Sequence, residues 1–108
     1  MSKIYSISLE DLYARHSALA KNEIVLDVRT TDEFNSGHVP GSTNISHDVL
    51  ETKLDSLHGV EKINIYCRAG ARAQFAAEIL KKAGIAEIAV VTSGGMPDWA
   101  MCGYPVEK

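Results

Sequence analysis

The sequence has few cysteines and no long hydrophobic run. Its 108 residues include two cysteines, Cys67 and Cys102, so one disulfide is the most it can form, and its composition is not that of a disulfide scaffold. No apolar run approaches the roughly 20 residues that cross a bilayer. The N-terminus also lacks an apolar segment followed by a small-residue cleavage site. These absences predict a cytoplasmic protein with reduced thiols and no membrane partner.

The sequence also lacks a large excess of charge of one sign. Its net charge is −3, and 45% hydrophobic with 23% charged residues is typical of a globular domain. This balance gives no reason to expect a nucleic-acid partner, so any anion site must be a local feature. The length predicts a single domain over residues 1–108, with a core from about residue 4 to about residue 106.

Short apolar segments alternate with amphipathic ones along the chain. The predicted strands are 3–8, 23–28, 62–67 and 87–92, with a shorter one within 38–45. One predicted helix follows the capping residue Ser8, a second occupies part of 30–37, and a third spans about 47–57. A fourth buries a face formed by Phe75, Ala76, Ile79, Leu80 and Ala83, and a last one starts near Pro97. This alternation predicts an α/β fold, with a mostly parallel central sheet and helices on both faces.

The segment C-R-A-G-A-R joins a predicted strand to a predicted helix and begins at Cys67. Ligands of parallel sheets bind at the carboxyl ends of the strands, and Cys67 lies at such an end. The N–H groups at a helix start have no helical acceptor and favour an anion such as a thiolate. Gly70 permits the backbone angles of a tight loop, and the small side chains of Ala69 and Ala71 leave its N–H groups accessible. The pattern therefore indicates Cys67 as a nucleophile in an anion cradle.

Two arginines decide between this interpretation and a simpler one. A lone cysteine that ends an apolar strand is usually a core residue. A buried core thiol gains nothing from two adjacent guanidinium groups, however, whereas Arg68 and Arg72 can both donate charge-assisted hydrogen bonds to a small oxyanion. Residues 68–72 are therefore predicted to bind the substrate.

Other segments accompany this loop in a fixed order. LDVRTTDEFNSGHVPGSTNI precedes it, and SGGMPDW and GYPVEK follow it. Together with IYCRAGARA they resemble the rhodanese-like sulfurtransferase family, in particular its single-domain members, over roughly Ser8 to Lys108. The loop fits the family's Cys-x-x-Gly-x-Arg pattern at Cys67, Gly70 and Arg72. The chain departs from the family at Ala73, where members often carry a small hydroxyl residue.

The resemblance implies a rhodanese-like fold and a thiosulfate sulfurtransferase that works by a two-step, ping-pong transfer of sulfane sulfur. The Cys67 thiolate takes the outer sulfur of a small anionic donor such as thiosulfate, sulfite leaves, and Cys67 becomes a persulfide. Cyanide, a small thiol or a thioredoxin-like protein then accepts the sulfur. Arg72, together with Arg68, would hold the sulfonate end of the donor. The resemblance implies no metal and no organic cofactor.

Alternative functions remain open at this point. The persulfide could be a carrier that delivers sulfur to a protein partner, and the sequence does not separate this from a free-standing enzyme. A catalytically idle binding module is disfavoured, because degenerate copies usually lose the loop cysteine. Cysteine phosphatases enclose phosphate in a longer loop, Cys-x5-Arg, whereas four residues separate Cys67 from Arg72. The shorter loop favours a sulfur atom over the phosphate or arsenate that such enzymes bind.

Residues outside the loop are interpreted as structural. Asp27 and Arg29 end a predicted strand on the ligand side and are expected to form an ion pair that supports the site. His38 fits a position of the family and is expected to hydrogen-bond to Asp27 or to the backbone rather than to act as a base. Cys102 is expected to be a packed or partly exposed thiol, not a partner that resolves the persulfide. Trp99 is expected to anchor the last helix.

Overall fold

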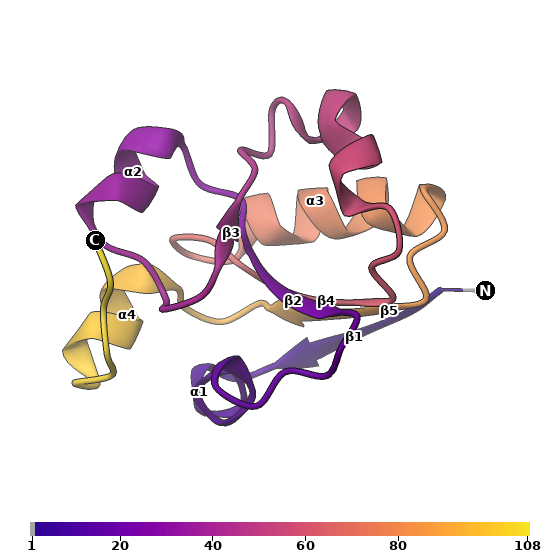
Figure 1. Ribbon diagram of the computed structural model, residues 1–108. Coiled ribbons are helices and arrows are strands. Elements are labelled where there is room, and N and C mark those ends of the chain that lie inside the picture. The colour runs from indigo at the N-terminus through magenta and orange to yellow at the C-terminus, as the bar shows by residue number, and fades with distance from the viewer. Residues whose placement is uncertain (1) are drawn as a thin grey trace.

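Five strands form one sheet in the computed structural model, which describes residues 2–108 (Figure 1). They are β1 (Lys3–Ile7), β2 (Glu23–Asp27), β3 (Thr43–Asn44), β4 (Lys62–Tyr66) and β5 (Glu87–Val91). Their order across the sheet is β1-β5-β4-β2-β3, and the strands pair in parallel. The α/β fold with a parallel sheet, predicted from the sequence, is therefore confirmed. Met1, the first residue of the predicted domain, lies outside the described residues.

Helices cover both faces of this sheet, as predicted. Helices α1 (Leu9–His16) and α4 (Met96–Met101) pack on one face, and α3 (Ala71–Lys82) with the 3₁₀ helix η1 (Leu50–Leu57) on the other. Figure 1 shows α1 and α3 on opposite sides of the strands, and α2 (Thr31–Ser36) beyond their carboxyl ends. Within residues 2–108, every helix is too short or too polar to span a membrane.

The two sides of β4 contribute to different cores, because successive strand residues point to opposite faces. Ile65 and Cys67 belong to the cluster under α3 and η1. Tyr66, between them, belongs to the cluster under α1 and α4, together with the fully buried Trp99. The indole Nε1 of Trp99 donates to the carbonyl of Pro105 at 2.6 Å, so α4 and the C-terminal segment are tied to the core.

Two sequence predictions are wrong in detail. Residues 47–57 were expected to form a helix, and a helix is present, but it is a 3₁₀ helix over Leu50–Leu57 that starts later than expected, and its N-cap residue Val49 makes no side-chain hydrogen bond. The leucines at 50, 54 and 57 have the spacing of an α-helix, in which they would share one face, so their pattern predicted a helix but not the tighter 3₁₀ turn, in which residues i and i+3 align. Phe75 was expected on the buried face of α3, yet it is 54% exposed. The face against the sheet is lined by smaller residues and by one leucine: Ala73, Ala76, Ala77 and Leu80.

Candidate active site

Cys67 lies directly after β4, in the turn that leads into α3. Its side chain is 1% exposed and belongs to the core cluster under α3. The Sγ atom accepts a hydrogen bond from the backbone N–H of Gly70 at 3.0 Å. The thiol is thus buried and turned toward an amide at the start of a helix, where the helix dipole favours negative charge.

Two glycines hold this turn in a tight conformation. Gly70 caps α3 with a φ of +102°, and a Cβ built on it would lie 2.4 Å from the carbonyl oxygen of Thr92. A Cβ on Gly95 would lie 2.1 Å from the carbonyl oxygen of Cys67. The N–H of Met96 donates to that same carbonyl at 3.0 Å. The cysteine turn therefore rests directly on the turn after β5, with no room for a side chain at either contact.

The two arginines of the loop differ in their surroundings. Arg68 is exposed, as are Ala69 and Ala71. Arg72 is instead engaged by Glu33 of α2: its Nη1 and Nη2 donate to the two carboxylate oxygens at 2.7 and 3.0 Å. These hydrogen bonds lower the pKa of Glu33 from 4.5 to about 2 and raise the pKa of Arg72.

Glu33 was not singled out as a site residue from the sequence. The signal available for it was local: Thr30 and Glu33 have the spacing of a capping box, which the structure forms at the start of α2. That pattern predicts a helix start, but it does not reveal that the carboxylate also reaches an arginine on α3.

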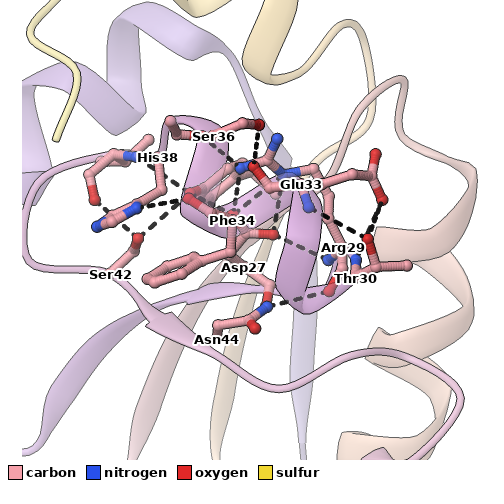
Figure 2. A network of polar contacts seen from close by, with 12 residues as sticks. Asp27, Arg29, Thr30, Glu33, Phe34, Ser36, His38, Ser42 and Asn44 are labelled. Atoms are coloured by element: carbon pink, nitrogen blue, oxygen red, sulfur yellow. Dashed lines mark hydrogen bonds and ion pairs between the residues drawn. The ribbon is translucent and has the colours of Figure 1, made fainter. Parts of the chain in front are cut away.

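Asp27 and Arg29 form a buried ion pair at the end of β2, with Arg29 Nη2 2.7 Å from Asp27 Oδ2 (Figure 2). The same Nη2 donates to the carbonyl of Gly37 at 2.7 Å, and the Tyr66 hydroxyl donates to Asp27 Oδ2 at 2.7 Å. Burial disfavours the charge of Arg29, but the hydrogen bonds with Asp27 prevail and raise its pKa. Burial, with the charge of Asp27, raises the pKa of Tyr66. The pair therefore ties β2, β4 and the end of α2 together.

His38 has partners for both of its ring nitrogens (Figure 2). Nδ1 lies 2.8 Å from the carbonyl oxygen of Phe34, and Nε2 lies 3.2 Å from a carboxylate oxygen of Glu107. The ring also stacks on Phe34, with 3.6 Å between the centroids. His38 therefore bonds to the backbone rather than to Asp27, and it joins α2 to the C-terminal segment.

A cavity of about 310 Å³ opens beside the cysteine loop. One part of its wall is charged, with Arg29, Glu33 and Arg68, and another part is apolar, with Met96, Pro97 and Val106. Neither cysteine is among the residues that line this cavity: Cys67 is buried behind the loop that carries Arg68, and Cys102 is a free, exposed thiol. In the part of the chain that the structure describes, no three His, Cys, Asp or Glu side chains are grouped to hold a metal ion.

Comparison with known proteins places this geometry in a family. A family model described as a rhodanese-like domain matches residues 8–102. The protein YrkF of Bacillus subtilis, a candidate sulfur carrier, is 35% identical over 75 residues, which cover 69% of this chain and 40% of that protein. A sulfurtransferase of Allochromatium vinosum is 30% identical over 90 residues, covering 82% of this chain and 83% of that protein. The matched regions cover 40%, 46% and 59% of the length of the first three curated relatives, so this chain corresponds to only part of each of those proteins.

Solved structures give the same fold. A rhodanese-related protein of Thermoplasma volcanium is 34% identical with a TM-score of 0.78, covering 94% of this chain and 96% of that one. A protein of unknown function from Rhodopseudomonas palustris, described as a possible tyrosine phosphatase, is 26% identical with a TM-score of 0.85, covering 96% of this chain and 85% of that one. The likeness therefore extends over nearly the whole chain.

Proposed function

Because the chain belongs to the family of rhodanese-like domains, we propose that it is a sulfurtransferase that carries sulfane sulfur on Cys67. The observation that supports this most is the placement of the thiol: Cys67 directly follows β4, and its Sγ accepts a hydrogen bond from the N–H of Gly70 at the start of α3. An anion at this position, whether thiolate or persulfide, receives a hydrogen bond and lies at the positive end of a helix.

The proposed loading step is a displacement at sulfur. The Cys67 thiolate attacks the outer sulfur of thiosulfate or a similar donor, the S–S bond of the donor breaks, and sulfite leaves with the electron pair. The balance is Cys67–S⁻ + S–SO₃²⁻ → Cys67–S–S⁻ + SO₃²⁻. Cyanide, a small thiol or a thioredoxin-like protein then takes the outer sulfur and restores the thiolate. We propose no metal and no organic cofactor for either step.

The loop and the cavity are proposed to bind the donor. Ala69 and Ala71 are exposed and small, so the loop amides beside Cys67 are open to a ligand. Arg68 faces the cavity and is proposed to bind the anionic end of the donor. Arg72 is proposed to assist, although Glu33 already engages both of its terminal nitrogens. Asp27, Arg29 and His38 are proposed to support the site through the surrounding elements.

A phosphatase is the second candidate, because one similar structure is described as a possible tyrosine phosphatase. The loop of this chain has four residues between Cys67 and Arg72, one fewer than the phosphatase pattern, so it offers less room for a tetrahedral phosphate. We therefore expect no hydrolysis of an aryl phosphate above the rate of the Cys67→Ser variant. Phosphate release at a rate comparable with sulfur transfer would favour the phosphatase instead.

Mass spectrometry of the intact protein tests the proposed function. Incubation with thiosulfate should add one sulfur atom, and cyanide should remove it as thiocyanate. Cys67→Ser should abolish the gain in mass, whereas the matched variant Cys102→Ser should retain it, because Cys102 is an exposed thiol at the end of α4 and only Cys67 accepts the N–H of Gly70 at the start of α3. An unchanged mass under an excess of thiosulfate and of a hydropersulfide would rule the proposal out. Loss of turnover in Cys102→Ser would instead assign that thiol a role.

A carrier and a free-standing enzyme differ in their acceptors. The relative YrkF is a candidate sulfur carrier, and a relative from Allochromatium vinosum is a sulfurtransferase, so both roles have support. Loaded protein should be mixed in turn with cyanide, a small thiol and a reduced thioredoxin-like protein. Fast transfer to the protein acceptor alone would favour a carrier. We also propose a reducing, cytoplasmic setting, in which the buried Cys67 and the exposed Cys102 remain free thiols.

A further inference from the structure

Glu33 is held in place from two sides. Its Oε1 accepts hydrogen bonds from the backbone N–H and the hydroxyl of Thr30, each at 3.1 Å, in the capping box that starts α2. Its two oxygens also accept from Arg72 at 2.7 and 3.0 Å. The side chains of Arg72 and Glu33 are 26% and 30% exposed, so water only partly screens the pair. Releasing Arg72 toward a ligand would break a bidentate ion pair whose acceptor is already fixed.

The pairing leaves little free positive charge at the cavity beside the cysteine loop, which Arg68 lines. Arg29, in the cavity wall, is neutralised by Asp27 at 2.7 Å. Arg72 is neutralised by Glu33, which itself lines the cavity. Among residues 2–108, Arg68 is the guanidinium of the cavity wall that has no ion-pair partner. The site can therefore compensate one negative charge on a donor more readily than two.

We propose that Glu33 sets the donor selectivity of this site, favouring small hydropersulfides over thiosulfate. This inference rests on the proposed function, since it concerns which donor loads Cys67. Thiosulfate is a dianion, and at this site it meets only one unpaired guanidinium, because Glu33 holds the second arginine of the loop in an ion pair. A hydropersulfide with an uncharged organic group carries at most one negative charge. Its organic group can contact the apolar part of the wall at Met96, Pro97 and Val106.

The loading step with such a donor is balanced without any further reactant. The Cys67 thiolate attacks the outer sulfur, the S–S bond of the donor breaks, and the organic thiolate leaves with the electron pair. The proton stays on the transferred sulfur: Cys67–S⁻ + R–S–SH → Cys67–S–SH + R–S⁻. No oxidant or reductant is consumed. Because the pKa of Glu33 is lowered to about 2 by Arg72, its carboxylate is charged throughout the neutral pH range.

The variant Glu33→Gln tests the proposal, because glutamine retains an acceptor for the cap of α2 but loses the charge. Loading would be followed by mass spectrometry with two donors, thiosulfate and 2-hydroxyethyl hydropersulfide, to give kcat/KM for each. The ratio of thiosulfate to hydropersulfide should rise about tenfold, equivalent to about 1.4 kcal/mol. Asp32→Asn is the matched control: it removes the same charge from the neighbouring, exposed position of α2 and should leave the ratio unchanged.

The possible outcomes separate the inference from the proposed function. A ratio that Glu33→Gln leaves unchanged, in a wild type that both donors load, would overturn the role of Glu33 alone. An equal loss with both donors would show that Glu33 only shapes the loop and would also overturn it. Failure of both donors to load the wild type would overturn the proposed function itself. If Glu33→Gln does not fold, Glu33→Ala should move the ratio in the same direction, and no change would again be decisive.

Discussion

At the scale of single residues, two backbone constraints meet at Gly70, in the turn that follows Cys67. Gly70 combines a φ of +102° with a contact that leaves no space for a Cβ, 2.4 Å from the carbonyl oxygen of Thr92. Gly84, at the other end of α3, has a similar φ of +87° but open space around its Cα. A comparison of the two glycines therefore separates the free-energy cost of a positive φ in an L-residue from the cost of a steric clash of its Cβ.

Substituting each glycine by alanine should therefore give different results. Gly84→Ala should lower the free energy of unfolding by about 1–2 kcal/mol, the cost of a left-handed conformation in an L-residue. Gly70→Ala should lower it by about 2 kcal/mol more, since backbone must also move by an amount that core packing resists. Urea denaturation measures both, and Gly70→Ala should also lose sulfur loading. Equal decreases in the free energy of unfolding for the two variants would mean that the backbone of the cysteine turn can shift to accommodate the added methyl group at little cost.

At the scale of elements, helices α2 and α3 are connected across the site by the ion pair of Glu33 and Arg72. Glu33 lies in the first turn of α2 and Arg72 in the first turn of α3, near the carboxyl ends of β2 and β4. The pair thus fixes the position of α2 relative to the cysteine turn. Its contribution to stability depends on the charge of Glu33, and this gives it a characteristic dependence on pH.

The stability difference between the wild type and Glu33→Gln should depend on pH in one direction. The pKa of Glu33 is about 2 in the folded protein, against a usual value of 4.5, so the folded state favours its charged form. The stabilisation should be fully present above about pH 4.5 and should disappear as the pH falls toward about 2. Urea denaturation of both proteins at several pH values measures the difference. A difference that stays constant through this range would show that the pair contributes nothing to folding.

At the scale of the whole molecule, the buried ion pair of Asp27 and Arg29 connects several segments of the fold. Asp27 is fully buried and Arg29 is 5% exposed. Their further partners come from two other elements: the hydroxyl of Tyr66 on β4, which is far away in the sequence, and the carbonyl of Gly37 just after α2. Such a pair is costly to break from one side, because the remaining charge is then buried without compensation.

Removal of one partner should therefore destabilise the entire fold. Asp27→Ala should lower the free energy of unfolding by about 3–5 kcal/mol, the range for a buried ion pair that loses one member. Asp32→Ala, at an exposed position of α2, should change it by less than about 1 kcal/mol. Thermal and urea denaturation compare the two variants. A loss at Asp27 no larger than that at Asp32 would show that the buried ion pair contributes little to the stability of the fold.

Much of the fold followed from local patterns in the sequence. The strands are short apolar runs, and α1 and α2 begin at the capping residues Ser8 and Thr30, so period and capping chemistry were enough to place these elements. Cys67 could also be placed at the carboxyl end of a strand, next to a helix start, because that depends on neighbours in sequence. Its role as a nucleophile remains a prediction that the loading experiment tests.

Contacts between distant segments could not be derived in this way. The periodicity of α3 did not predict that Phe75 would be exposed. In the structure, the face with the small residues Ala73 and Ala76 packs on the sheet, and Phe75 lies outside that face. Likewise, no spacing in the sequence indicated that Arg72 would be taken by Glu33, which is 39 positions away. The sequence by itself determined the elements, the parallel sheet and the place of the thiol. Only the tertiary structure decided which charges near that thiol are paired, because ion pairs form between side chains that folding brings together.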